Sequence, residues 1–416
     1  MRVYVKNMRG QPLMPTTPQK ARTLLKQGKA KVISRTPFTI QLKYATGETV
    51  QPITLGVDAG SKKIGLSATT KMDELYSSEI ILRTDIVGLL SARCQFRRAR
   101  RSHTTRYRAP RFNNRRKPDG WLAPSIEQKI NTHLKAIEQL YRILPISRII
   151  VEVAAFDIQK IKNPTIGGID YQQGEQLDFW NVREYVLFRD GHKCQHCKGK
   201  SKDKILNVHH IESRKAGGDA PNNLITLCKT CHNKHHKGEL TVKVKRGQSF
   251  RDATFMGIMR WAFYNQLKAQ YPNVSLTYGY ITKNTRIHNG LDKAHRIDAR
   301  CISGNPNAIP LDCWYQQKAA RRHNRQIHKA TINKGGARIL NQAPKYVFGF
   351  QLFDKVLFDG HECFIYGRRS RGYFDLRLLN GTKIHAGANY KRLRLLEMAN
   401  TLLTERMQNN DSATRF

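Results

Sequence analysis

Residues 53–60 read ITLGVDAG, a short apolar run that carries one carboxylate, Asp58, with a glycine on either side of it. Further short apolar runs follow at 64–68 and 76–82. Short runs of this kind, separated by a few polar residues, are typical of neighbouring strands. The stretch therefore predicts an antiparallel meander with an acidic side chain near the end of its first strand, and we expect a larger sheet to form around it.

Helices and a further strand follow in alternation. Apolar residues recur at helical spacing over 126–144, which predicts an amphipathic helix capped by Ser125 and ended by Pro145. The run RIIVEV at 148–153 is typical of a buried strand, and it carries Glu152. Because strands alternate with helices, we expect an α/β fold, and the length of 416 residues predicts a multidomain chain.

A later segment adds two more candidate site residues. His295 and Asp298 are three positions apart, and therefore lie on one face of a helix. Together with Asp58 and Glu152 they could hold two Mg²⁺ (or Mn²⁺) ions about 4 Å apart, an arrangement that hydrolyses phosphodiesters. Each residue alone has a simpler explanation, as a strand-end cap or an edge residue. The interpretation depends on the combination.

Two cysteine pairs indicate a structural zinc site. Cys194-x-x-Cys197 and Cys228-x-x-Cys231 are separated by 30 residues, and four thiolates satisfy the tetrahedral coordination that zinc prefers. The alternative is four unrelated free thiols. A zinc ion with four sulfur ligands needs no histidine, so the histidines beside the cysteine pairs indicate a second role. They could be ligands of another metal together with a general base, or they could be surface side chains of a zinc-ribbon binding module.

The charge predicts a polyanionic partner. Lys and Arg number 73 against 31 Asp and Glu, a formal net charge of +42. Residues 93–117 hold eleven basic residues and no acid, so we predict a basic helix that continues into a basic loop. The candidate nucleic-acid-binding residues are Arg93, Arg97, Arg98, Arg100, Arg101, Arg106, Arg108, Arg111, Arg115 and Arg116. No apolar run is long enough for a membrane span, and the first residues do not form a secretory signal, so we expect a cytoplasmic protein.

The order CxxC, His-His-Ile, Asn-Leu-Ile-x-Leu-Cys-x-x-Cys-His over residues 190–236 resembles the HNH nuclease family. The resemblance implies that His209 is a ligand of a divalent ion and that His210 is the base that activates water. It implies that Asn223 holds the ββα loop and that His232 is the second ligand. His236 could replace His232 as that ligand, and the sequence does not choose between them.

The order of the carboxylates resembles a RuvC-type, ribonuclease-H-like nuclease. The segments that carry the resemblance are GVDAG at 56–60, IVE at 150–152 and His295-x-x-Asp298. The resemblance assigns Asp58, Glu152 and Asp298 to magnesium, and His295 to proton transfer.

An HNH unit within a split RuvC nuclease, with an arginine-rich segment after the first part and the residues PLMP at 12–15, resembles the IscB family of RNA-guided nucleases. The implied fold is an RNase H-like mixed sheet split in three segments, with an inserted ββα-metal HNH domain. The implied order is an N-terminal PLMP domain (1–53), RuvC segment I (54–92), an arginine-rich bridge helix (93–117), RuvC segment II (118–156), a linker (157–180), the zinc-containing HNH domain (181–245), RuvC segment III (246–310) and a basic β-rich domain that reads a target-adjacent motif (311–416).

The resemblance implies an RNA-guided DNA endonuclease with two active sites. The HNH site would cut the strand paired to the guide, and the RuvC site the displaced strand. The expected partners are a guide RNA and target double-stranded DNA, and no membrane. The expected assembly is a monomeric ribonucleoprotein in the cytoplasm of a prokaryote, associated with the nucleoid. The alternatives are a guide-independent HNH homing or restriction-like endonuclease, and a non-catalytic ribonucleoprotein scaffold.

Overall fold

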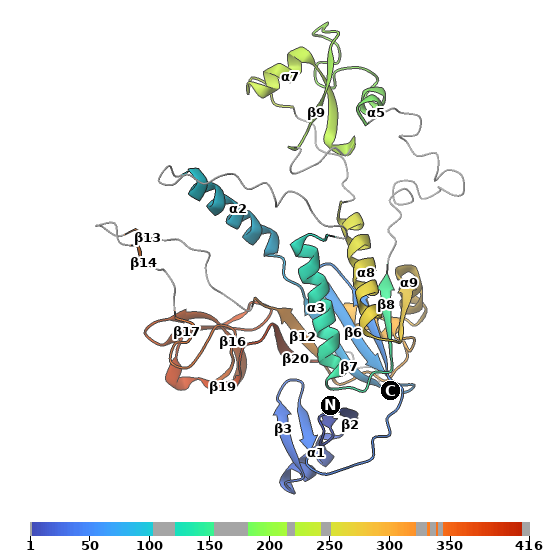
Figure 1. The fold of residues 1–416 in the computed structure, drawn as a ribbon, viewed down its shortest axis with the longest axis vertical. Helices are drawn as coiled ribbons and strands as arrows, with labels where there is room; N and C mark the ends of the chain where they lie inside the picture. Colours follow the sequence, from blue (N-terminus) through green and yellow to red (C-terminus); the bar gives the residue numbers. More distant parts are fainter. Residues whose placement is uncertain are drawn as a thin grey trace. The chain divides into compact units, whose positions relative to one another are not determined.

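The structure is a computed structural model, and it describes residues 2–102, 121–153, 182–213, 221–242, 251–321, 331–332, 338–339 and 344–409. The chain divides into two compact units (Figure 1). The first contains Met1–Ala154 and Met259–Phe416, and the second, Ala155–Ile258, interrupts it in sequence. The predicted linker at 157–180 lies outside the described residues, as does most of the basic loop after residue 102.

A seven-stranded mixed sheet dominates the first unit, with the order β11-β8-β5-β6-β7-β12-β20. Its strands come from widely separated stretches of the chain, and their bounds are Thr54–Ala59 (β5), Lys63–Thr69 (β6), Glu74–Ile81 (β7), Arg148–Val153 (β8), Val274–Tyr278 (β11), Cys313–Ala319 (β12) and Leu402–Gln408 (β20). The predicted antiparallel meander is confirmed, because β5 pairs with β6 and β6 with β7 in antiparallel register. Strand β8 then pairs with β5 in parallel, as crossover connections through a helix require.

The last part of the chain contributes to this sheet as well. Strand β12 pairs with β7 in parallel, and β20 pairs with β12 in antiparallel register. The structure therefore differs from the predicted boundary at residue 311, since strands on both sides of it share one sheet. The physical reason is that β7 would otherwise present an unpaired backbone edge, which β12 and β20 extend and cover.

Helices that connect strands of this sheet include Ile86–Ser102 (α2), Pro124–Tyr141 (α3), Arg251–Gln270 (α8), Gly279–His288 (α9) and His295–Ile302 (α10). The amphipathic helix predicted over 126–144 corresponds to α3. The prediction that Ser125 caps α3 is wrong. Ala123 is the N-cap residue and makes no side-chain cap bond, and Pro124 occupies the first turn. Proline has no amide hydrogen to satisfy and a backbone angle suited to a helix start, so the helix begins before the serine.

Helix α10 lies directly against β5 and β6, and two glycines make this possible. A Cβ atom on Gly56 would lie 1.9 Å from the carbonyl oxygen of Ala299, and one on Gly65 would lie 1.9 Å from that of His295. Both obstacles are backbone atoms of α10, which no side-chain rotation can move. The helix can therefore approach the sheet only where these two strand positions have no side chain.

A smaller mixed sheet, β2-β1-β4-β3, forms the N-terminal part. Its elements are Val3–Lys6 (β1), Pro12–Thr16 (β2), Pro18–Lys26 (α1), Ala30–Ser34 (β3) and Thr39–Leu42 (β4). The prolines of the PLMP residues fall in β2, an edge strand, where a missing amide hydrogen is tolerated. The Tyr4 hydroxyl donates a 2.9 Å hydrogen bond to the carbonyl oxygen of Leu75, which joins this sheet to β7.

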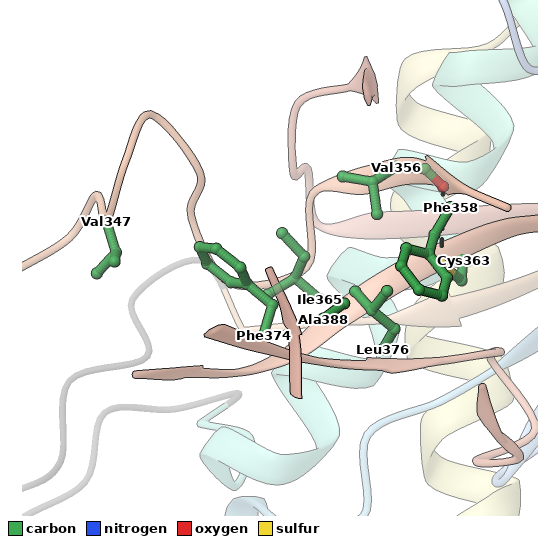
Figure 2. Close-up of a cluster of buried hydrophobic side chains, with 8 residues drawn as sticks. All are labelled: Val347, Val356, Phe358, Cys363, Ile365, Phe374, Leu376 and Ala388. Carbon is green, nitrogen blue, oxygen red and sulfur yellow. Dashed lines mark hydrogen bonds between the residues drawn. The ribbon is translucent and has the colours of Figure 1, made fainter. Parts of the chain in front are cut away.

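A five-stranded antiparallel sheet, β18-β17-β16-β15-β19, lies near the C-terminus. Its strands are Lys355–Phe358 (β15), His361–Arg369 (β16), Tyr373–Arg377 (β17), Lys383–Asn389 (β18) and Arg394–Glu397 (β19), preceded by the short pair Thr331–Ile332 (β13) and Arg338–Ile339 (β14). Figure 2 shows its apolar core, which includes Phe374 and Leu376. The turn between β15 and β16 uses Asp359 and Gly360, both with positive φ, as the residue pair predicts.

The second unit has a ββα arrangement. Its elements are Val182–Arg189 (α5), Leu206–His210 (β9), the 3₁₀ turn Pro221–Asn223 (η2), Leu224–Cys228 (β10) and Lys229–His236 (α7). Strands β9 and β10 are antiparallel, and β10 leads directly into α7. Taken together, the described residues form an α/β multidomain fold with several mixed or antiparallel sheets. No helix among them is long and apolar enough to cross a bilayer.

The contact of α10 with the sheet gives a testable expectation. Gly56→Ala should destabilise the first unit by about 1–3 kcal/mol or more, because the new methyl group overlaps backbone that cannot move aside. Gly88→Ala is the matched control, since Gly88 is exposed on α2 with no other atom within 4 Å of a Cβ. The control should be neutral or slightly stabilising. Equal melting temperatures for the two variants in calorimetry would contradict this reading of the contact.

Candidate functional site

Two carboxylates lie next to each other at the ends of adjacent parallel strands. Val57 of β5 is paired with Val151 of β8, so the next residues, Asp58 and Glu152, are neighbours in the same register. Both residues are buried, with exposed fractions of 6% and 8%. Two acids that are buried side by side need a compensating charge, because each disfavours the ionised form of the other.

Helix α10 brings the remaining two predicted residues to the same place. His295 is the first residue of the helix, and its Nδ1 lies 2.6 Å from Oδ2 of Asp58. Asp298 follows one turn later, on the same side as the histidine. The structure therefore brings Asp58, Glu152, His295 and Asp298 together from three separate elements, 240 positions apart at the extremes.

The pKa shifts of this cluster indicate that its carboxylates lack sufficient positive charge nearby. Burial raises the pKa of the Glu152 carboxyl, and the charge of Asp58 raises it further. The pKa of Asp298 is raised by the same two causes, in the same order. Oxygen ligands in such an arrangement suit a hard divalent cation, whose charge would remove the mutual repulsion. The donor set thus fits magnesium.

Two arginines that the sequence analysis did not single out hold the carboxylates. Arg260 of α8 is buried; its Nε donates a 2.7 Å hydrogen bond to the carbonyl oxygen of Ala59, and its Nη1 lies 3.5 Å from Oε1 of Glu152. Arg286 of α9 lies 3.0 Å from Asp298, measured from Nε to Oδ1. One signal was available, since Arg260 is the one charged residue within the otherwise apolar run FMGIMRWAF at 255–263.

Among the described residues, two groups have ligand atoms that all lie within 4.8 Å of one another, and the carboxylates are not one of them. Each carboxylate is instead drawn toward its own cationic or histidine neighbour. The acids thus gather at one end of the sheet, close enough to shift each other's pKa, in a looser arrangement than a bound pair of ions requires.

The first compact group consists of the four predicted cysteines. Cys194, Cys228 and Cys231 are buried, and Cys197 is half-buried. The Sγ atoms of Cys197 and Cys228 lie 3.8 Å apart. Four sulfurs at about 2.3 Å from a tetrahedral zinc are about 3.8 Å from each other, so the observed spacing fits zinc. Cys228 also serves as the N-cap of α7, with the amide of Cys231 bonded to its sulfur.

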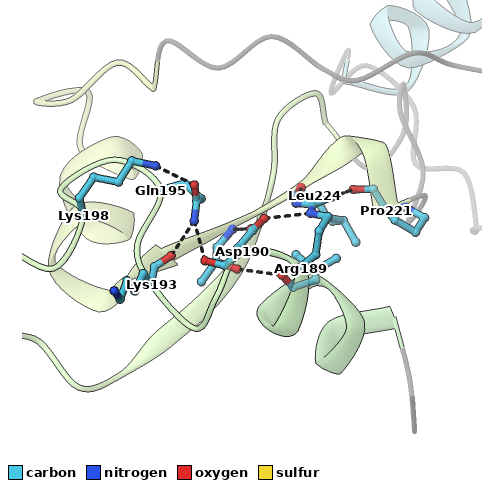
Figure 3. Close-up of polar contacts among 9 residues, drawn as sticks. Arg189, Asp190, Lys193, Gln195, Lys198, Pro221 and Leu224 are labelled. Carbon is cyan, nitrogen blue, oxygen red and sulfur yellow. Dashed lines mark hydrogen bonds and ion pairs between the residues drawn. The ribbon is translucent and has the colours of Figure 1, made fainter. Parts of the chain in front are cut away.

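A buried acid fixes the first cysteine loop to strand β10. Asp190, which was not predicted, accepts hydrogen bonds of 2.8 Å from Nε of Arg189 and from the amide of Thr226. Gln195, between the paired cysteines, donates to the carbonyl oxygen of Asp190. Figure 3 shows how these contacts converge, with Arg189 also reaching the carbonyl oxygens of Pro221 and Leu224. These hydrogen bonds connect the first cysteine loop to β10.

The second compact group is His209, His232 and His236. His209 is buried on β9, and His232 and His236 are one helical turn apart on α7, with their Nε2 atoms 3.3 Å from each other. The two histidines left as alternatives by the sequence therefore lie together beside His209. Three imidazoles in this arrangement suit a divalent transition metal with open positions.

The surroundings of His209 keep its imidazole neutral, and a buried asparagine orders the nearby loop. Burial, and then the neighbouring imidazoles, lower the pKa of His209 to about 4, so that its nitrogen lone pair is free for a metal at neutral pH. His235, another residue not predicted, contributes to this shift. Asn223 is completely buried; its Nδ2 donates to the carbonyl oxygen of Glu212 at 3.0 Å, and its Oδ1 accepts from the amide of Glu212 at 2.9 Å.

His210 lies on the same strand as His209, and adjacent strand residues point to opposite faces. It is half-exposed, unlike its buried neighbour. One histidine of the pair therefore faces the group on α7, while the other remains accessible from outside.

The basic stretch is helical where it is described. Helix α2 begins at Ile86, earlier than the predicted start at 93, and it includes RRARR at 97–101. Arg93, Arg97 and Arg98 are exposed on it. The candidate residues Arg106, Arg108, Arg111, Arg115 and Arg116 lie outside the described residues. A cavity of about 880 Å³ beside the start of α2 is lined by Phe96, Arg83 and Lys318, among other residues.

Comparison with protein families gives two matches. Residues 3–174 match the family described as RRXRR protein, and residues 194–238 match the family described as HNH endonuclease. The first match contains β5, α2 and β8, and the second contains both compact ligand groups. The second match confirms the resemblance of this segment to the HNH nuclease family.

Comparison with individual proteins gives shorter or weaker likenesses. Anaredoxin of Nostoc sp. is 46% identical over 41 residues, which cover 10% of this chain and 54% of that protein, so the chain spans about half of it. Cas9 of Streptococcus thermophilus in complex with the GGAA PAM is 14% identical, with 44% of this chain and 26% of that one covered and a TM-score of 0.29. The Type II-C Cas9 of Actinomyces naeslundii is 12% identical, and the match covers 61% of this chain and 60% of that chain with a TM-score of 0.24. At these scores the two structures carry no argument about the fold.

The cysteine group predicts a measurable zinc content. The purified protein should contain one zinc ion per chain by elemental analysis, and Cys197→Ser should lose it together with the folded state of the ββα unit, because zinc binding supplies much of the folding free energy of such small units. Cys94→Ser, which changes a half-buried cysteine of α2, is the control and should keep the ion. Retention of zinc by Cys197→Ser would show that the sulfurs do not form a metal site.

Proposed function

We propose that this chain, which matches the RRXRR family over residues 3–174 and the HNH endonuclease family over residues 194–238, is a nuclease of the IscB-like kind that cuts double-stranded DNA selected by a bound guide RNA. The observation that carries the proposal is the presence of two chemically different candidate sites in separate units. One is built from carboxylates and the other from histidines. Two antiparallel DNA strands held apart by a guide require two such sites.

In the first site, Asp58, Glu152 and Asp298 would hold magnesium in the manner of a RuvC-type nuclease. The bound ions would supply activation of a water molecule and stabilisation of the leaving oxygen. Arg260 pairs with Glu152 and Arg286 pairs with Asp298, and each pairing fixes the orientation of one carboxylate. His295 would transfer the proton. Its Nδ1 is fixed by Asp58, while the half-exposed ring leaves its other nitrogen for the substrate.

In the second site, His209, His232 and His236 would hold one divalent ion, whose chemistry is stabilisation of the negative charge that develops on the phosphate. His210 would accept the proton of the attacking water, since it lies on the accessible side of β9. Asn223 would keep the loop before β10 in place through its two hydrogen bonds with the backbone of Glu212. The zinc group stabilises the unit and takes no part in the reaction.

Sequence selection belongs to the guide in this proposal. Basic residues of α2 would grip the RNA backbone, since arginine forms bidentate contacts with phosphate, and the C-terminal sheet would read a short target-adjacent motif. The protein would act as a monomeric ribonucleoprotein in the cytoplasm of a prokaryote. The net charge of +42 supports a partner of this kind, because without phosphates the chain would repel itself.

Strand-specific nicking tests the assignment of the sites. Asp58→Ala should cut only the strand paired to the guide, and His210→Ala only the displaced strand, each with a loss of at least a hundredfold at the affected site because an essential ligand or base is missing. Denaturing gels with differently labelled strands measure both cuts. Asp292→Ala and His196→Ala, which change exposed residues of the same units, are the controls. Two cuts by either test variant would disprove the corresponding assignment.

Removal of the RNA and of the metal separates the proposal from its alternatives. Protein purified from cells that express the neighbouring non-coding DNA should carry a defined transcript, and both RNase treatment and EDTA should abolish cleavage. Cleavage by RNA-free protein would instead support an HNH homing or restriction-like enzyme that reads duplex DNA itself. Binding without any cleavage in magnesium would support a ribonucleoprotein scaffold.

A further inference from the structure

Two tyrosines form an exposed, nearly parallel pair beside the carboxylate site. The ring planes of Tyr278 and Tyr280 are 12° apart and their centroids are separated by 6.1 Å, within the range of an offset stack. The two residues are 39% and 67% exposed, and Ile281 next to them is 42% exposed. Large apolar side chains that gather on a surface mark a binding site more often than single exposed ones do.

This pair is attached to the backbone that contacts Glu152. Gly279 lies between the tyrosines at the junction of β11 and α9, and a Cβ atom there would lie 3.2 Å from Oε1 of Glu152. Each tyrosine is one Cα step, about 3.8 Å, from this glycine. That step is close to the rise of about 3.4 Å between stacked nucleotides. The backbone that carries both rings therefore lies beside Glu152.

The helix that follows the pair is also part of the site. Helix α9 carries Arg286, which pairs with Asp298, and the buried Thr282, which favours the charged form of Glu152. One short helix and its first turn therefore contact two of the three carboxylates and present the two rings. Lys283 is exposed on the same helix and supplies positive charge for a phosphate backbone.

We propose that Tyr278 and Tyr280 form a stacking platform for unpaired DNA bases next to the phosphate that is cut at the carboxylate site. The ligand class is single-stranded DNA, because bases must be free of their partners to stack on a side chain. Stacking accepts every base, as each has a π face. A platform of this kind suits a nuclease whose target is selected by a guide RNA, because the DNA strand at the cutting site then has no fixed sequence. The inference rests on the proposed function.

The test compares the two cuts in one reaction of the guide-loaded protein. Tyr280→Ala should slow cleavage of the displaced strand about tenfold at subsaturating DNA, the size of one lost base stack, and should leave cleavage of the paired strand unchanged. Tyr280→Phe keeps the ring and should restore the rate. Tyr44→Ala, a tyrosine of similar exposure to Tyr278 in the N-terminal part, is the control and should behave as wild type.

A second readout does not depend on cleavage. In the Asp58→Ala background, a displaced strand with 2-aminopurine beside the cutting position should fluoresce less in the complex than it does in the complex of the Asp58→Ala, Tyr280→Ala double variant, because stacking on the ring quenches this base. An equal effect of Tyr280→Ala on both strands, or a Tyr280→Phe variant as slow as the alanine variant, would overturn the platform. If Asp58→Ala itself leaves the displaced-strand cut intact, the proposed function fails, and the platform with it.

Discussion

The close contact between helix α10 and strands β5 and β6 is the constraint on which the carboxylate site depends. Gly56 and Gly65 leave no side chain between the helix backbone and the sheet, and only this approach places His295 within 2.6 Å of Asp58. Helix α10 carries two of the four residues of the cluster, so a change in its distance from the sheet would move both. The precision of the site therefore originates in two residues that take no part in its chemistry.

The two candidate sites are held by different physical means. The carboxylates sit on a large buried sheet, where burial raises the pKa of Glu152 and Asp298 and arginines oppose that rise. The ββα unit has only a small apolar core, so a tetrahedral sulfur group and the hydrogen bonds around Asp190 replace much of the packing. A unit stabilised in this way can be inserted into another fold without an extensive interface.

Much of the fold was predictable where the signal is local. The meander from β5 to β7, the helix that begins at His295 and the turn at Asp359 and Gly360 all follow from periodicity or turn chemistry within a few residues. The failures also have local explanations, as at Pro124, where the helix starts before the serine expected to cap it. The addition of β12 and β20 to the large sheet was missed because no local pattern specifies a strand's partner.

The sequence by itself determined the ligand types and their spacing, as in the cysteine pairs and the two histidines one turn apart on α7, because a short loop or a helical turn fixes the distance between residues close in the chain. Only the tertiary structure decided that both of these histidines lie beside His209, and that Arg260 and Arg286 hold the carboxylates. Those contacts join residues that are distant in the chain and meet only through strand pairing and helix packing. Periodicity along the sequence does not predict these tertiary contacts, because it describes each helix or strand and not the elements that pack against it.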